Sequence, residues 1–121
     1  MQSDKSNTIV ENDFFVDALT HLQNCVHQNA VNHGWWEGDQ NDAEKIALMH
    51  SELSEALEAL RIGNPDDEKC HDYTSVEVEL ADCIIRILDY AGRRGLRIAE
   101  AILAKHEYNL TRPYKHGMKR F

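Results

Sequence analysis

Four acidic residues occur as two pairs with the same spacing. Glu52 and Glu55 are three residues apart in "HSELSEALEAL", and Glu79 and Asp82 are three residues apart in "EVELADCIIRIL". Residues three apart are neighbours on one side of a helix. Two such pairs on adjacent helices would bring together four carboxylates that repel one another, and divalent cations such as Mg²⁺ prefer oxygen ligands of this kind. The pattern therefore predicts a magnesium site rather than a di-iron site, because neither pair has a histidine three residues after its glutamate.

A second interpretation of the acidic pairs remains open. A solvated helix face also carries glutamates, so the same residues fit a non-catalytic helical module that pairs with a partner through apolar side chains. The segment that contains Glu79 and Asp82 favours the first interpretation. It is apolar over most of its circumference, and its narrow polar strip consists of Ser75, Glu79, Asp82, Arg86 and Asp89.

The C-terminal part of the chain is basic, whereas the rest is acidic. Residues 1–92 contain 5 Lys and Arg against 19 Asp and Glu, and residues 93–121 contain 8 against 2. The net charge of −8 argues against binding of a nucleic-acid polymer. Lys105, Asn109 and Arg112 are spaced by four and three residues, which places them on one helical face where they could contact a small polyanion.

Two adjacent tryptophans, Trp35 and Trp36, occur in the glycine-flanked segment "GWWEG". An exposed tryptophan can stack on a nucleobase. Neighbouring residues point in different directions, so we expect one tryptophan at a base and the other in the core, without a basis for choosing between them. His33, just before this segment, is a weaker candidate for contact with a base edge.

The elements that carry these residues are predicted to be helices. The sequence favours helices from about residue 13 to 33, from 42 to 62, from 75 to 94 and from 96 to 110, with capping-box patterns at Asn41–Glu44 and Thr74–Glu77. Four helices with short connections predict an all-α, four-helix bundle in one domain over residues 1–121, with a loose end at 1–8 and an irregular basic tail at 111–121.

Apolar residues predict how these helices pack. One apolar stripe of the second helix consists of Ile46, Met49, Leu53, Ala56, Leu57 and Leu60. The third helix has too much apolar surface for a monomer of 121 residues to cover, so we expect a homo-oligomer.

The composition, with a hydrophobic fraction of 42%, is typical of a soluble globular protein, and we expect a cytoplasmic location from the cysteines described below. No apolar run reaches the roughly 20 residues that span a bilayer. The N-terminus shows no secretory pattern, and the odd number of cysteines fits reduced thiols rather than a disulfide framework.

The order of these motifs resembles a known family. Glu52 and Glu55, then 23 intervening residues, then Glu79 and Asp82, followed by "KHEYNLTRPYKHG", are similar to the signature of the MazG-like all-α nucleoside triphosphate pyrophosphohydrolases. The resemblance extends from about Gly34 to the C-terminus, and it is to the short, single-domain members of that superfamily.

This resemblance implies an activity and roles for residues. The implied reaction is Mg²⁺-dependent hydrolysis of nucleoside or deoxynucleoside triphosphates, with Mn²⁺ as a substitute, between the α- and β-phosphates to a monophosphate and pyrophosphate. Glu52, Glu55, Glu79 and Asp82 match the metal ligands, and Glu52 or Glu55 would also activate water. Phosphate contacts would come from Lys105, Asn109 and Arg112. The family pattern points to dimers or to tetramers built as dimers of dimers, and of these we expect the homotetramer. A related enzyme acting on a phosphoribosyl-nucleotide is an alternative.

Overall fold

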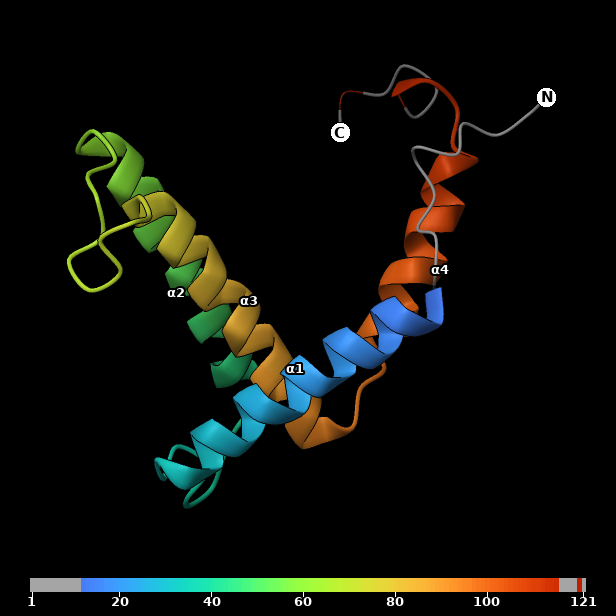
Figure 1. The fold of residues 1–121 in the computed structure, drawn as a ribbon, viewed down its shortest axis with the longest axis horizontal. Coiled ribbons are helices and arrows are strands. Elements are labelled where there is room, and N and C mark those ends of the chain that lie inside the picture. The colour runs from blue at the N-terminus through green and yellow to red at the C-terminus, as the bar shows by residue number, and fades with distance from the viewer. Residues whose placement is uncertain (1–11, 116–119, 121) are drawn as a thin grey trace. The chain divides into compact units, whose positions relative to one another are not determined.

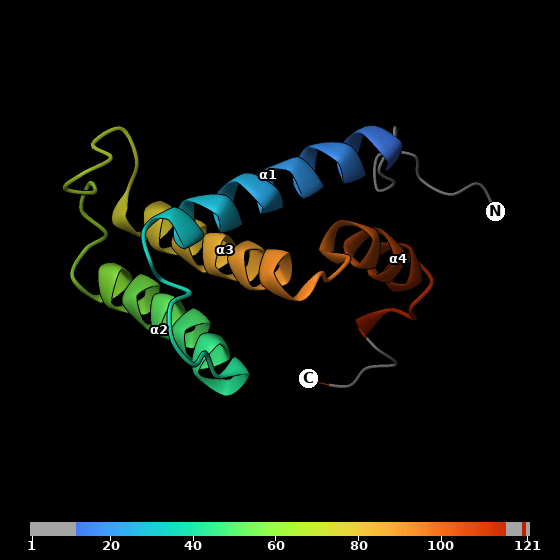
Figure 2. The ribbon, with the colours of Figure 1, turned by 90° about the horizontal axis from the view of Figure 1, so that it is seen from below.

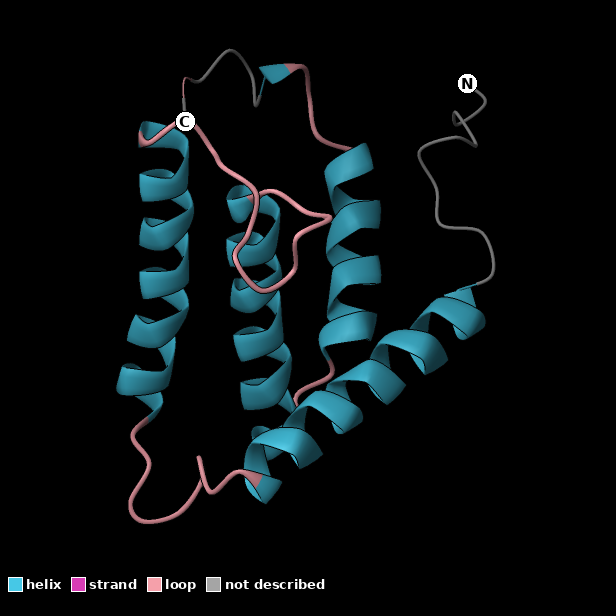
Figure 3. Cartoon of the chain, turned by 60° about the vertical axis from the view of Figure 1, so that its left-hand side comes forward, coloured by secondary structure: helices cyan, strands magenta, loops and turns pink. Residues whose placement is uncertain are grey.

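The computed structural model describes residues 12–115 and residue 120. The predicted loose end at residues 1–8 lies outside the described residues, as do residues 116–119 and 121 of the predicted tail. The described residues form four helices and no strand (Figure 3). A single antiparallel bridge joins Asp66 and Thr74 in the connector between the second and third helices. The helices are α1 (Asn12–Asn32), α2 (Asp42–Arg61), α3 (Ser75–Arg94) and α4 (Ile98–Leu110) (Figure 1). The all-α class is confirmed, and each helix begins and ends within two residues of the prediction.

Local capping explains why the predicted ends of the helices agree with the structure. The side chain of Asn41 accepts a hydrogen bond from the backbone N–H of Glu44 at the start of α2. At the start of α3, Thr74 and Glu77 each accept a hydrogen bond from the other's backbone N–H, which completes a capping box. Gly95 ends α3 in the left-handed conformation, at φ 66°, which costs a residue without Cβ little.

The chain divides into two compact units. Residues 22–96 form one unit, and the remaining described residues on either side of it form the other. The unit of residues 22–96 contains the C-terminal part of α1 together with α2 and α3, and it carries both acidic pairs and both tryptophans. The other unit contains α4, which carries Lys105 and Asn109. Each unit is described by itself below.

Helices α2 and α3 lie side by side in opposite directions (Figures 1 and 2). The buried residues of α2 are Glu52, Ala56 and Ala59, and those of α3 are Cys83, Leu88 and Ala91. The small side chains of the alanines allow the two backbones to approach closely. The acidic side chain of Glu52 is thus part of a helix interface and not of a solvated face.

The predicted apolar stripe of α2 is buried only in part, because Ala56 is 5% exposed and Met49 is half-buried, whereas the leucines of the stripe are exposed. Leu53, Leu57 and Leu60 are 48%, 61% and 55% exposed. Helix α3 packs on the side of α2 where Glu52, Ala56 and Ala59 lie. Leu80 and Ile84 of α3 are also more than 40% exposed, so a large apolar surface of this helix pair is open to solvent.

The C-terminal part of α1 packs against the C-terminal part of α3. A Cβ atom added at Gly92 would lie 2.7 Å from Cβ of His27, so glycine is required for this close approach. Gln23, which is buried, donates from Nε2 to the backbone carbonyl of Leu96 at 3.2 Å. Ala30 is 2% exposed. These contacts fix the last turns of α1 beside the site described next.

No helix in the described part of the chain combines the length and the apolar character that crossing a membrane requires.

Candidate functional site: a three-carboxylate cluster beside a tryptophan-lined cavity

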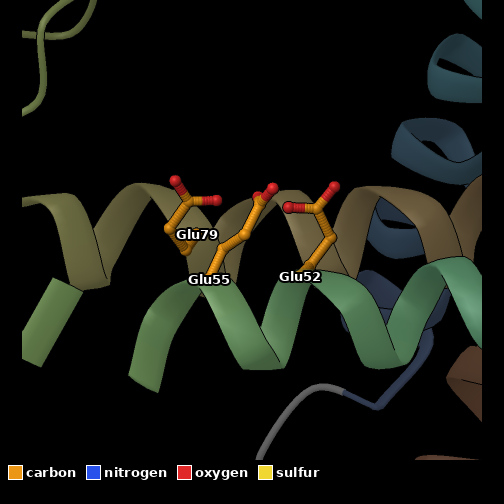
Figure 4. A group of neighbouring side chains, drawn as sticks. All are labelled: Glu52, Glu55 and Glu79. Carbon is orange, nitrogen blue, oxygen red and sulfur yellow. The ribbon is translucent and has the colours of Figure 1, made fainter. Parts of the chain in front are cut away.

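Three carboxylates meet where α2 packs against α3. Glu52 and Glu55 project from α2 and Glu79 projects from α3, and one oxygen of each lies within 4.8 Å of the other two (Figure 4). The three side chains differ in burial, because Glu52 is buried, Glu79 is half-buried and Glu55 is exposed. The structure therefore brings together three of the four acidic residues that the sequence singles out.

Asp82, the fourth acidic residue, lies next to this cluster but outside the group of three. It lines a cavity together with Glu52. Burial raises the pKa of Asp82, and the negative charge of Glu52 raises it further. Asp82 is thus close enough to Glu52 for the charge of Glu52 to affect its pKa, although its carboxylate is not one of the three that cluster.

Glu52 has one paired oxygen and one unpaired oxygen. Arg86 donates from Nε to Oε1 of Glu52 at 2.7 Å. Oε2 is buried and, among the residues that the structure describes, has no hydrogen-bond partner. Burial alone would raise the pKa of Glu52, but the hydrogen bond from Arg86 and the positive charge of Arg86 help to outweigh it, so this pKa lies below its usual value.

The pKa of Glu79 is shifted in the opposite direction from that of Glu52. Burial and then the proximity of Glu55 and Glu52 raise the pKa of Glu79 from 4.5 to about 7. Without a cation, the cluster relieves its repulsion by keeping a proton near neutral pH. A divalent cation would do the same with a larger charge, and three carboxylates with an unpaired buried oxygen are a ligand set that suits Mg²⁺.

A cavity of about 400 Å³ lies beside Glu52. Asn29 of α1, Trp35 of the following loop and Ile85 of α3 contribute to its walls, as do Asp82 and Arg86 near the acidic cluster. A second cavity of about 290 Å³ adjoins the same loop, and Trp35, Arg86 and Asp89 line both. The site thus combines an acidic cluster with an adjacent space of suitable size for a small organic ligand.

The two tryptophans occupy different environments. Trp36 is 6% exposed, donates from Nε1 to Oδ1 of Asp89 at 2.9 Å, and has the Nζ atom of Lys45 4.1 Å from its ring centroid. Trp35 is 60% exposed and lines both cavities. Trp35 is therefore the tryptophan that a ligand can reach, and Trp36 anchors the loop.

His33 lies next to Trp35 but does not line either cavity. Its Nδ1 is 2.8 Å from the backbone carbonyl of Asn29, and its ring centroid is 5.9 Å from that of Trp35. Its position fits support of the Trp35 ring more closely than contact with a base edge.

The three residues predicted to bind phosphate belong to the unit that contains α4. Lys105 and Asn109 lie in α4 and Arg112 follows it. The Nζ atom of Lys105 and the Cζ atom of Arg112 lie 4.8 Å and 5.8 Å from the ring centroid of Tyr108, so both cations gather around one aromatic side chain. All three residues are exposed.

Arg86 and Asp89 line both cavities, although neither was assigned to a site from the sequence. Both belong to the polar strip of α3 that also contains Glu79 and Asp82, and this strip was the signal for them. Their partners, Glu52 for Arg86 and Trp36 for Asp89, lie 34 and 53 residues away in the chain.

Comparisons with known proteins give no match, since no protein-family model, no curated protein and no solved structure matches the chain. The function is therefore argued from the site.

Proposed function

We propose that the protein is a Mg²⁺-dependent nucleoside triphosphate pyrophosphohydrolase that releases a monophosphate and pyrophosphate. The observation that carries this proposal is the unpaired Oε2 atom of Glu52, which is buried within a cluster of three carboxylates. A buried carboxylate oxygen without a partner costs free energy unless a ligand satisfies it. Its neighbours are acidic, so the ligand that fits is a cation.

The geometry of the cluster suits a small divalent cation. One oxygen from each of Glu52, Glu55 and Glu79 lies within 4.8 Å of the others. Two oxygens on opposite sides of Mg²⁺ stand about 4.2 Å apart, so small side-chain movements would bring all three to one ion. Such an ion supplies charge neutralisation on phosphate oxygens and a lowered pKa for water.

Arg86 and the glutamates of the cluster have different roles in the proposed reaction. Arg86 holds Glu52 by its Oε1 atom, so that Oε2 keeps a fixed direction. Glu55 is the exposed member of the three, and its carboxylate is open to an attacking water. In the proposed reaction the water oxygen bonds to the α-phosphorus, and the bond from this phosphorus to the bridging oxygen breaks. The electron pair leaves with pyrophosphate, and Glu55 accepts the proton.

The cavity beside Glu52 gives the nucleoside a place to bind. Trp35 offers an exposed ring at its wall, and base–aromatic stacking tolerates different bases. Lys105 and Arg112 would carry phosphate charge, as the family resemblance implies. We also propose Mn²⁺ as a substitute metal, and nucleotide-pool control or clearance of modified nucleotides as the role of the activity, in the cytoplasm.

A direct assay tests this function. Standard and modified NTPs and dNTPs are incubated with the protein in Mg²⁺, in Mn²⁺ and in EDTA, and monophosphate and pyrophosphate are quantified together. We expect equimolar release of both products with metal and none in EDTA. Glu55→Gln should abolish release, whereas Glu58→Gln is the matched control, because Glu58 lies one turn away and pairs with Arg61 on the surface.

Two other outcomes would point elsewhere. Cleavage of a phosphoribosyl-nucleotide without cleavage of free triphosphates would indicate the related reaction on the same site. Absence of metal-dependent turnover and of nucleotide binding would contradict the proposal and favour a helical interaction module.

We propose further that the protein is a homo-oligomer, and a tetramer rather than a dimer. The support is the apolar surface of α2 and α3 that remains open, which includes Leu53, Leu57, Leu60 and Ile84. Soluble proteins seldom leave so many large apolar side chains exposed together. Successive residues of an α-helix are about 100° apart around its axis, so Leu57 and Glu55 point in nearly opposite directions and a partner could cover this surface without covering the carboxylates.

A further inference from the structure

We propose that Asp89 selects nucleotides by the amino group of their base. Cytosine and adenine, which carry an exocyclic amino group at the pyrimidine 4-position and the purine 6-position, would be preferred over uracil, thymine and hypoxanthine, which carry a carbonyl there. This inference rests on the proposed function, because it names the substrate class of the same site.

The position of Asp89 brings its side chain to the place where a base would bind. Asp89 lines the cavity of about 400 Å³ beside Glu52 and also the adjoining cavity of about 290 Å³. Trp35, the exposed aromatic side chain of the site, lines the same two cavities. A base stacked on Trp35 would therefore have its edge near the carboxylate of Asp89.

The side chain of Asp89 is held from two separate elements. Trp36 donates from Nε1 to Oδ1 of Asp89 at 2.9 Å, and Nδ1 of His27 lies 2.9 Å from the same oxygen. The side chain is 16% exposed. The hydrogen bonds that orient this carboxylate use Oδ1 and not Oδ2, so a fixed acceptor can be offered to a ligand without loss of the anchoring contacts.

The chemistry of a carboxylate makes this acceptor selective. An ionised carboxylate accepts hydrogen bonds and donates none, whereas an exocyclic amino group donates. A base carbonyl at the same position would place two acceptors against each other. Binding sites built to hydrogen-bond one group reject an analogue that lacks it, because the polar atom of the site is left without a partner.

Arg86 is the other charged side chain that lines both cavities, and it would have the opposite preference, since it donates only. Its Nε atom is bonded to Glu52 at 2.7 Å, so the arginine is tied to the side of the site where the phosphates would lie. Asp89 is tied to the tryptophan loop instead. The two residues thus divide the site into a phosphate side and a base side.

Matched substrate pairs test the inference. The bases of dCTP and dUTP differ in the amino or carbonyl group at the pyrimidine 4-position, and those of dATP and dITP differ in the same way at the purine 6-position. The measured quantity is kcat/KM for each substrate with the wild-type protein and with Asp89→Asn. The asparagine keeps an oxygen for Trp36 and His27 but replaces the second acceptor by an N–H donor. We expect the wild type to favour the amino member of each pair by about tenfold or more, and Asp89→Asn to lose or reverse this ratio.

Two controls separate selectivity from folding. Asp72→Asn makes the same chemical change in the exposed connector before α3 and should leave both ratios unchanged. An unchanged melting temperature and tryptophan emission of Asp89→Asn would show that Trp36 remains anchored. A wild-type protein that turns over both members of each pair equally would overturn the inference, whatever the variant does.

Failure of the proposed function is distinguishable from failure of this inference. The equilibrium binding of dCMP and dUMP can be measured by the quenching of tryptophan fluorescence, and this measurement does not depend on turnover. Tighter binding of dCMP that is lost in Asp89→Asn would support the selectivity even if no triphosphate were cleaved. Equal binding of the two monophosphates, or no binding of either, would contradict it.

Discussion

Arg86 and Glu52 form a hydrogen-bonded ion pair in which only one carboxylate oxygen takes part. The Nε atom of Arg86 lies 2.7 Å from Oε1, while Oε2 stays buried and has no hydrogen-bond partner in the described part of the chain. The pair joins α3 to α2 and directs an unsatisfied oxygen into the acidic cluster. The same contact thus contributes to the helix interface and to the proposed metal site.

Arg86→Gln should destabilise the protein and weaken metal binding. Removing Arg86 leaves the buried charge of Glu52 uncompensated. Because Arg86 is 41% exposed, we expect a loss of about 2 kcal/mol, less than for a fully buried pair. Urea unfolding measures the stability, and titration calorimetry measures the affinity for Mg²⁺. Arg61→Gln is the control, because the exposed Arg61–Glu58 pair should contribute little. Equal losses in the two variants would show that the pair with Glu52 has no special role.

Glu79→Gln should stabilise the metal-free protein at alkaline pH. The pKa of Glu79 is raised from 4.5 to about 7 by folding, so its contribution to stability is fully present below pH 4.5 and is lost as the pH rises through 7. Glutamine removes this loss, and we expect a gain of about 1 kcal/mol at pH 8 after allowance for solvent screening, which disappears near pH 5. Thermal unfolding in EDTA across this range measures it.

Added Mg²⁺ should make the wild-type protein more stable than Glu79→Gln, which is the reverse of their order in EDTA at pH 8. Wild type gains stability by binding the ion, and Glu79→Gln gains less because one ligand is lost. If the variant melts below wild type in EDTA at pH 8, the carboxylates do not repel one another as the geometry requires.

Trp35→Ala and Trp36→Phe should separate binding from stability. Trp35 is exposed, so its loss should weaken nucleotide binding about tenfold, as expected for one stacked base, with little effect on unfolding. Trp36→Phe removes the N–H that bonds Asp89, and we expect a loss of about 1–3 kcal/mol of stability. Fluorescence titration with dNMPs and urea unfolding measure the two effects. If Trp36→Phe weakened nucleotide binding and Trp35→Ala lowered the stability, Trp36 would be the base-stacking residue instead.

Gly92→Ala should destabilise the protein although Gly92 lies within α3. Glycine-to-alanine changes inside helices are ordinarily favourable by about 1 kcal/mol. Here the added methyl group would lie 2.7 Å from Cβ of His27, and such overpacking costs about 1–3 kcal/mol. Chemical unfolding gives the sign of the effect. A gain in stability would show that α1 does not approach α3 closely at this point.

The assembly state can be measured directly. Light scattering coupled to size-exclusion chromatography should give the mass of a tetramer of the 13.9 kDa chain. Leu57→Glu should reduce this mass, because it places a charge in the exposed apolar surface of α2. Leu110→Glu is a matched control on α4, in the other unit, where the leucine is 42% exposed. A monomeric wild-type protein would contradict the proposed oligomer, and the exposed leucines would then have no partner surface.

Several features of the fold could be predicted because they depend on neighbouring residues. Asn41, Thr74 and Gly95 cap their helices through contacts within a few residues, so the sequence alone places the ends of α2 and α3 closely. The helical spacing of Glu52 and Glu55 likewise follows from the sequence. The pairing of these two with Glu79 was a hypothesis that required α2 and α3 to pack with their acidic sides together.

The sequence by itself determined the all-α class, the helix boundaries and the two acidic pairs, because caps, glycines and i, i+3 spacing act locally. Only the tertiary structure decided which part of α2 is buried, since close packing against α3 favours the small side chains of Ala56 and Ala59 over the leucines of the predicted stripe. The same packing set the rotation of the helices about their axes. That rotation brings Arg86 into contact with Glu52 and Asp89 into contact with Trp36. No local sequence pattern specifies these pairings, because the partners are distant in the chain.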